Sequence, residues 1–277
     1  MSARDATGTA IVCADVNYLI PTTERPRLYD SWEPPAGVPR STVAFESRRV
    51  CIEDARQRTR PLRLDVEGMT FSRRPSATRN FDDDDHVRNV YYPEGAALIS
   101  EFTGATRVVV FDHTVRRRNP AAAVPGWPRR PVLEVHADYT ADSGPVRLRS
   151  LLGNEAPALL QRRFSIINVW RPILGPLQDA PLAICDASTV RPDQLVATDI
   201  LYPDRLGQIY YVTEDPHHRW YYLPKMRSDE VWLFKSYDSD EAGRARFAPH
   251  TAFENPCVSG EIIPRQSIEL RAFAFYE

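Results

Sequence analysis

The spacing of apolar and polar positions divides the chain into two regions. From residue 106 onward, short runs rich in β-branched and aromatic residues are broken by Pro, Gly and Asp, a pattern typical of strands joined by turns. Eight such runs follow one another, which predicts a β-barrel or a β-sandwich. The predicted strands are residues 107–112, 132–139, 164–170, 182–185, 208–213, 220–223, 230–237 and 267–276.

One segment, residues 146–162, has the period of a helix instead of a strand. Leucines recur there at helical spacing, and we expect this helix to pack outside the sheet. Residues 1–100 are rich in Pro and Arg and show little periodicity, with a turn signal at 34–37 and a polar run at 72–85. For this part of the chain we predict an irregular segment that covers the core.

Composition narrows the class of protein. Of 277 residues, 43% are apolar and 26% are charged, which excludes a disordered, coiled-coil or collagen-like chain. The net charge of -2 provides no attractive field for nucleic acid or an anionic membrane. No apolar run approaches the roughly 18 residues of a membrane span, and no secretory core follows the first residues, so we expect a cytoplasmic protein.

The four cysteines, Cys13, Cys51, Cys185 and Cys257, are widely separated and form no CxxC pair. This spacing supports neither a zinc site nor a redox motif. We therefore predict four free thiols, most of them buried.

The first candidate for chemistry is the pair His136-x-Asp138 at the end of the predicted strand 132–139. Side chains at positions i and i+2 share one face of a strand, so an imidazole and a carboxylate can reach one metal ion together. A pair of this kind also arises by chance or satisfies a buried hydrogen bond. The pair alone therefore leaves the question open.

A second histidine and an arginine complete the pattern. His250 follows His136 by 114 residues, and two histidines with one carboxylate form the facial triad that leaves positions open on Fe(II). Arg265 lies fifteen residues after His250, and Ser267 shares its strand face. A guanidinium fork beside a hydroxyl suits the far carboxylate of a dicarboxylic acid.

With these motifs, the chain resembles the Fe(II)/2-oxoglutarate-dependent dioxygenases. More narrowly it resembles the hydroxylase/desaturase family that includes the fungal gibberellin desaturase and the oxygenase of cephamycin methoxylation. The resemblance covers residues 85–277. It rests on the motifs above and on residues 111–116, 168–172, 181–186, 220–222, 229–235, 238–239 and 250–253.

The resemblance implies a mainly β fold with a double-stranded β-helix core, which is the cupin-like jelly roll, and a few flanking helices. We expect one oxygenase domain over residues 1–277, with the core in residues 101–277 and the covering segment in residues 1–100. A small-molecule substrate is implied, without a nucleic-acid or membrane partner. The chain is expected to act as a monomer or a homodimer.

The resemblance also assigns the site. His136, Asp138 and His250 would bind iron, Arg265 with Ser267 would bind 2-oxoglutarate, and O2 would be the second cosubstrate. Relatives convert 2-oxoglutarate to succinate and CO2 while they oxidise an unactivated C–H bond of a secondary metabolite by hydroxylation, desaturation or oxidative cyclisation. Tyr139 and Thr140 depart from the smaller polar pair common after this motif, which predicts a reshaped pocket beside the iron.

Three alternatives stay open from the sequence. Arg171 could bind an acidic substrate or the near carboxylate of 2-oxoglutarate, or form a structural ion pair. Arg271 shares the alternation of Arg265 and could replace it, or pair with Glu269. The third alternative is a cupin-like metal-dependent isomerase or hydrolase that does not use 2-oxoglutarate, and the Arg265–Ser267 pair argues against it.

Overall fold

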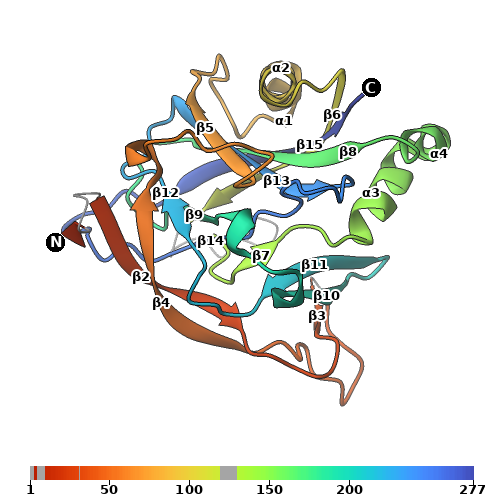
Figure 1. Cartoon of the computed structure of the whole chain (residues 1–277), viewed down its shortest axis with the longest axis horizontal. Helices are drawn as coiled ribbons and strands as arrows, with labels where there is room; N and C mark the ends of the chain where they lie inside the picture. Colours follow the sequence, from red (N-terminus) through yellow and green to blue (C-terminus); the bar gives the residue numbers. More distant parts are fainter. Residues whose placement is uncertain (1–2, 5–9, 31, 119–129) are drawn as a thin grey trace.

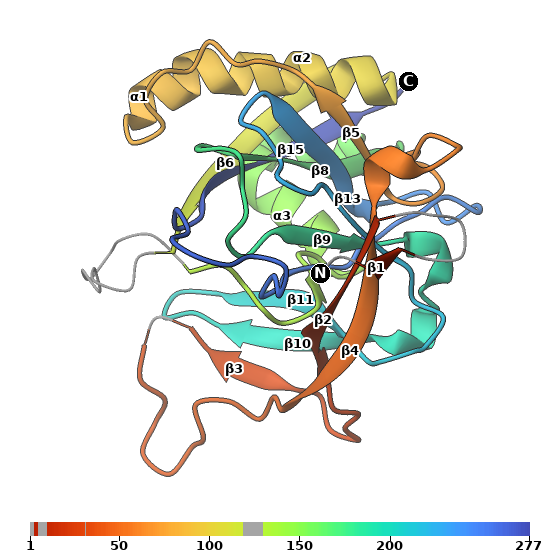
Figure 2. The ribbon, with the colours of Figure 1, turned by 90° about the vertical axis from the view of Figure 1, so that its left-hand side faces the viewer.

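Two β-sheets pack face to face and form the centre of the molecule (Figures 1 and 2). The structure is a computed structural model that describes residues 3–4, 10–30, 32–118 and 130–277. Five strands of the described chain form the smaller sheet, in the order β5 (Met69–Arg73), β13 (Glu230–Asp238), β8 (Phe164–Pro172), β15 (Gln266–Phe275) and β6 (Arg107–Arg117).

Ten strands of the described chain form the larger sheet. Their order is β1 (Ala3–Arg4), β2 (Ala10–Leu19), β4 (Phe45–Asp54), β12 (Trp220–Tyr222), β9 (Leu182–Cys185), β14 (His250–Ala252), β7 (His136–Ala137), β11 (Leu206–Val212), β10 (Leu195–Leu201) and β3 (Arg27–Tyr29). The predicted jelly-roll fold is confirmed. Each of the eight predicted runs contains a strand, although only residues 136–137 of the run 132–139 are paired as one.

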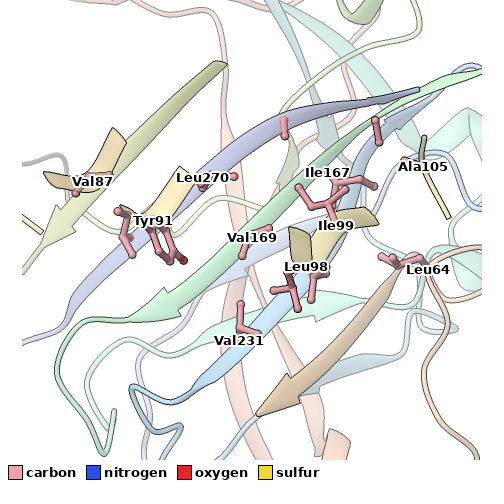
Figure 3. Packing of buried hydrophobic residues seen from close by; sticks show 14 residues of the cluster. Leu64, Val87, Tyr91, Leu98, Ile99, Ala105, Ile167, Val169, Val231 and Leu270 are labelled. Carbon is pink, nitrogen blue, oxygen red and sulfur yellow. The ribbon is translucent and has the colours of Figure 1, made fainter. Parts of the chain in front are cut away.

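The smaller sheet is buried on both faces, which explains the nearly continuous apolar runs of β8 and β13. Trp170, Trp232 and Phe234 pack between the two sheets. On the outer face, helix α2 (Tyr92–Thr103) lies across the sheet (Figure 2) and places Leu98 and Ile99 over it. Figure 3 shows this layer, in which the α2 side chains meet those of β8, β13 and β15.

The N-terminal hundred residues are not irregular, contrary to the prediction. β2 and β4 are ten-residue strands that pair with each other, and β4 pairs with β12. β5 joins the smaller sheet. Val12, Ala14, Val16 and Tyr18 alternate as buried residues, a strand signal that the Pro-rich surroundings obscure. The segment therefore supplies part of both sheets as well as α2.

The helix predicted over residues 146–162 is divided into two parts. α3 (Ser143–Leu152) ends at Gly153, whose φ of 46° is incompatible with a continuing helix, and α4 (Ala156–Leu159) follows. Helix α3 lies beside the two sheets (Figure 1), and its Leu148 belongs to a buried apolar cluster with Tyr237 and Phe273. The remaining helical segments are η1 (Ala55–Gln57), α1 (Asp84–His86), η2 (Val87–Tyr91), η3 (Gly153–Glu155), η4 (Ala187–Thr189) and η5 (Pro192–Gln194).

The prediction of four free thiols is wrong for two of them. Cys13 lies directly opposite Cys51 in the antiparallel pair of β2 and β4, with a Cα–Cα distance of 4.2 Å, and the two form a disulfide. Of the other two, Cys185 is buried and Cys257 is exposed. The register of the two strands brings the cysteines together, and spacing in the sequence does not reveal it.

Among the described helices, none has the length and apolar character needed to cross a membrane.

Candidate active site

Three ligand atoms meet where β7 and β14 lie side by side in the larger sheet. His136 on β7 stands directly opposite His250 on β14, and Asp138 follows β7. The Asp138 Oδ1 atom lies 3.5 Å from His136 Nε2 and 3.7 Å from His250 Nε2. All three ligand atoms lie within 4.8 Å of one another. The three residues predicted as iron ligands are therefore brought together.

Backbone carbonyls orient both imidazoles. His136 Nδ1 is 2.8 Å from the Glu134 carbonyl oxygen, and His250 Nδ1 is 3.1 Å from the Ala248 carbonyl oxygen. Each Nδ1 is therefore the protonated nitrogen that donates, and each Nε2 presents a lone pair to the centre. Burial lowers the pKa of His250 to about 3, so its imidazole is neutral at pH 7, as metal binding requires.

The second oxygen of Asp138 is held from the smaller sheet. Asp138 Oδ2 accepts hydrogen bonds from Asn168 Nδ2 at 2.8 Å and from Arg271 Nε at 2.9 Å. Burial by itself would raise the pKa of Asp138. The Arg271 guanidinium and the two histidines outweigh burial and hold this pKa well below its usual range. Asp138 is thus a carboxylate with one oxygen fixed and the other turned toward the histidines.

A buried network extends from Asp138 along β15 and β8. Glu269 accepts hydrogen bonds from Asn168 Nδ2 and from Arg271 Nη2, the latter at 3.0 Å. The predicted Arg271–Glu269 ion pair is confirmed. Ser236 Oγ donates to the Asn168 side-chain oxygen at 2.8 Å, which fixes the orientation of the amide.

Arg265 and Ser267 lie on the same face of the chain as Arg271, near the start of β15. Arg265 is 3% exposed, and its Nε donates to Ser267 Oγ at 3.1 Å while Nη1 donates to the Ala180 carbonyl oxygen at 2.7 Å. Its guanidinium carbon lies 4.9 Å from the centre of the Trp170 ring. Within the described chain, no carboxylate lies within ion-pair distance of this guanidinium.

Burial, together with the nearby Arg116 guanidinium, lowers the pKa of Arg265 to about 9. The side chain stays charged at neutral pH. A buried positive charge without a carboxylate is stabilised when an anionic ligand binds, which is the chemistry predicted for this position.

Arg171 is not brought to this group. Neighbouring residues of a strand face opposite sides, and Trp170 points toward Arg265 while Arg171 contacts Tyr91 on the outer face of the smaller sheet. His113 lies on β6, where its Nδ1 is 3.0 Å from the Tyr92 hydroxyl oxygen. Neither residue contacts the three ligands.

The sequence alone assigned no role to Asn168, which donates a hydrogen bond to Asp138, or to Trp170, whose ring lies against the Arg265 guanidinium. The sequence did contain a signal for Asn168. Asn168 is a polar residue within the apolar run 164–170, and a polar residue in a strand buried on both faces needs a specific partner.

The donor set fits Fe(II). Two imidazole nitrogens and one carboxylate oxygen converge, their outer atoms are hydrogen-bonded, and the group is largely buried. Two histidines and one carboxylate are the ligands of non-haem Fe(II) oxygenases. The same three ligands also bind other divalent metals, so the ligands alone do not identify the reaction.

The chain is similar to proteins named as iron- and 2-oxoglutarate-dependent oxygenases or as hydroxylase/desaturases. A family model described as an oxidoreductase/YMDC permease-like domain matches residues 16–275. The Fe(II)/2-oxoglutarate-dependent dioxygenase nvfI of Aspergillus novofumigatus is 33% identical over 260 residues, which is 90% of each chain. The hydroxylase/desaturase efuI of Hormonema carpetanum is also 33% identical, over 85% of this chain and 86% of its own.

A solved structure of the iron and alpha-ketoglutarate-dependent endoperoxidase NvfI superposes with a TM-score of 0.87 and 30% identity, covering 96% of this chain and 98% of that one. These similarities argue against the isomerase or hydrolase alternative. The chain belongs to the Fe(II)/2-oxoglutarate-dependent dioxygenase family and is an oxidoreductase that uses Fe(II), 2-oxoglutarate and O2.

Proposed function

We propose that His136, Asp138 and His250 hold the Fe(II) ion and that Arg265 with Ser267 binds the far carboxylate of 2-oxoglutarate. The observation that carries this proposal is the convergence of three ligand atoms within 4.8 Å of one another. The guanidinium of Arg265 supports the second half, because it is buried and forms no ion pair with the described chain.

When bound, Fe(II) and 2-oxoglutarate activate O2 as 2-oxoglutarate is converted to succinate and CO2, which supplies the oxidising power for a C–H bond. The residues of the chain provide position. Hydrogen bonds to the Glu134 and Ala248 carbonyls keep the two Nε2 atoms directed at the metal position. Asn168 and Arg271 hold Oδ2 of Asp138, so that only Oδ1 turns toward the metal position.

Metal binding by the purified protein tests the ligand assignment. Under anaerobic conditions, the wild type is expected to retain one Fe(II) per chain, and His136→Ala is expected to lose it. His217→Ala is the matched control, since the His217 side chain is 85% exposed and contacts Asp215. Equal iron content in His136→Ala and the wild type would contradict the assignment.

We further propose that the substrate is a small secondary metabolite oxidised at an unactivated C–H bond. The names of the relatives support this, because they include hydroxylase/desaturase and endoperoxidase. Hydroxylation adds one oxygen atom to the substrate, whereas desaturation or oxidative cyclisation removes two hydrogen atoms.

Mass spectrometry distinguishes these outcomes. The iron-loaded enzyme is incubated with a metabolite extract and O2, with and without 2-oxoglutarate. We expect a product that appears only with 2-oxoglutarate and matches one of these mass changes. If no fraction of the extract raises succinate formation above the level without extract, the proposal of a small-molecule substrate in that extract is contradicted.

The domain organisation, the oligomeric state and the location in the cell remain predictions. Residues 1–277 are proposed to form one oxygenase domain, which limited proteolysis tests. A monomer or a homodimer is tested by light scattering. The cytoplasmic location is tested by cell fractionation together with the state of the Cys13–Cys51 disulfide, because such bonds persist mainly in oxidising compartments.

A further inference from the structure

A cavity of about 300 Å³ lies on the outer side of the smaller sheet, where β8 ends. Its lining includes Thr78, Phe81, Arg171, Ile173, Leu174 and Ser228. The cavity is separate from the proposed iron site because none of the three metal ligands lines it. Strand β8 directs Asn168 and Trp170 to the iron side and Arg171 to the cavity side.

Arg171 brings a buried charge to this cavity. The residue is 3% exposed; its Nε donates to the Tyr91 hydroxyl at 3.1 Å and its Nη1 to the Arg74 carbonyl oxygen at 2.9 Å. Tyr91 itself is packed in the layer shown in Figure 3. Within the described chain, Nη2 makes no hydrogen bond and no carboxylate forms an ion pair with Arg171. Burial of a charge without a counter-ion is unfavourable, so an anion in the cavity would stabilise it.

The acidic residue at the cavity does not supply that anion. Asp229 lines the cavity, but its carboxylate binds Arg73 at 2.7 Å and Arg227 at 3.0 Å. Those two arginines neutralise it from the solvent side. Nη2 of Arg171 therefore still has no hydrogen-bond acceptor within the described chain.

We propose that this cavity binds the carboxylate of a small, partly apolar monocarboxylic acid. The carboxylate would accept a hydrogen bond from Arg171 Nη2 and compensate its charge. Phe81, Ile173 and Leu174 provide apolar walls for the rest of the molecule. The volume is at the small end of ligand pockets, which selects acids of the size of benzoic acid. This site is distinct from the one that binds 2-oxoglutarate.

Binding of benzoate tests the proposal, with benzamide as the uncharged probe of the same shape. The protein is loaded with Zn(II) and saturated with 2-oxoglutarate, so that the Arg265 site is already filled. Ligand-detected NMR is expected to show benzoate binding, with benzamide at least about tenfold weaker because it lacks the charge.

A blocking variant decides the location even if substitutions of buried Arg171 prevent folding. Leu174 is 45% exposed at the cavity, so Leu174→Trp is expected to fold and to abolish benzoate binding. Leu206→Trp is the matched control, since Leu206 is 56% exposed on β11, away from the cavity, and binding should be unchanged. No benzoate binding, equal binding of benzamide, or equal binding by the two tryptophan variants would each overturn the proposal.

Discussion

Arg265 and Arg271 lie six residues apart on one face of the same segment, yet their surroundings are opposite. Arg271 forms ion pairs with Asp138, Glu269 and Asp112 at 2.9 to 3.2 Å. Arg265 contacts a hydroxyl, a backbone carbonyl and the Trp170 ring, and none of the described carboxylates pairs with it. The protein compensates one buried charge with carboxylates, whereas no described carboxylate compensates the other.

The comparison separates two functions that look alike in the sequence. A buried arginine with several carboxylates positions other side chains, here the metal-binding Asp138. A buried arginine without a carboxylate is suited to bind an anion, which is the role proposed for Arg265. Substitutions of these two arginines, of Ser267 and of a buried histidine should distinguish the two roles.

Removing Arg271 is expected to destabilise the metal-free protein strongly. Arg271→Met leaves Asp138 and Glu269 as buried carboxylates without their cation, which costs about 3–5 kcal/mol of unfolding free energy. Urea unfolding measures it. Arg147→Met is the control: Arg147 also reaches Asp112, at 3.3 Å, but its side chain is 28% exposed, and a change within about 1 kcal/mol is expected.

Removing Arg265 is expected to weaken cosubstrate binding instead of the fold. Arg265→Met should raise the KM for 2-oxoglutarate by about 100-fold or more, because the far carboxylate loses its charge partner. In urea, the same variant without ligand should unfold within about 1 kcal/mol of the wild type, since no ion pair is broken. An unchanged KM would move the role to another cation.

Ser267→Ala should have a smaller effect on the same step. The hydroxyl accepts from Arg265 Nε at 3.1 Å and orients the guanidinium. Its loss is expected to raise the KM for 2-oxoglutarate roughly fivefold to tenfold, with little change in kcat. A fall in kcat at constant KM would show that Ser267 acts elsewhere.

His218 is a third buried titratable residue, and unlike the two arginines it is uncharged at neutral pH. Burial lowers its pKa to about 4, and its ring nitrogens are 3.0 Å from the Tyr18 hydroxyl and from Gln194 Oε1. The unfolded chain therefore binds this proton first, and stability is lost as the pH falls from the unfolded pKa near 6.5 toward 4. Between pH 8 and pH 6 the loss from this residue is less than about 1 kcal/mol. In His218→Gln, this part of the acid dependence should disappear from urea unfolding curves.

The sequence predicts the local part of the site well. His136 and Asp138 share a strand face, and the later His250 and Arg265 follow at recognisable spacings, so their types and order suffice. What the sequence does not show is which strands become neighbours. The contact of Asn168 with Asp138 depends on how β8 lies against the larger sheet, and the Cys13–Cys51 bond depends on the register of β2 with β4.

The position of Arg171 could be predicted from the sequence only in part. Its side chain could be placed by alternation from Trp170, because consecutive strand residues face opposite sides. Which of those sides holds the iron is decided by the packing of the two sheets, and this is a property of the whole chain.

Anaerobic titration with Fe(II) and 2-oxoglutarate shows whether the two bind together at the proposed site. Their joint binding to the proposed site predicts a weak visible charge-transfer band in the wild type and its loss in Asp138→Ala. Asp112→Ala is the matched control: it removes another carboxylate that pairs with Arg271, at 3.2 Å, but no metal ligand, and it should keep the band. Absence of the band in iron-loaded wild type, or its persistence in Asp138→Ala, would contradict the account.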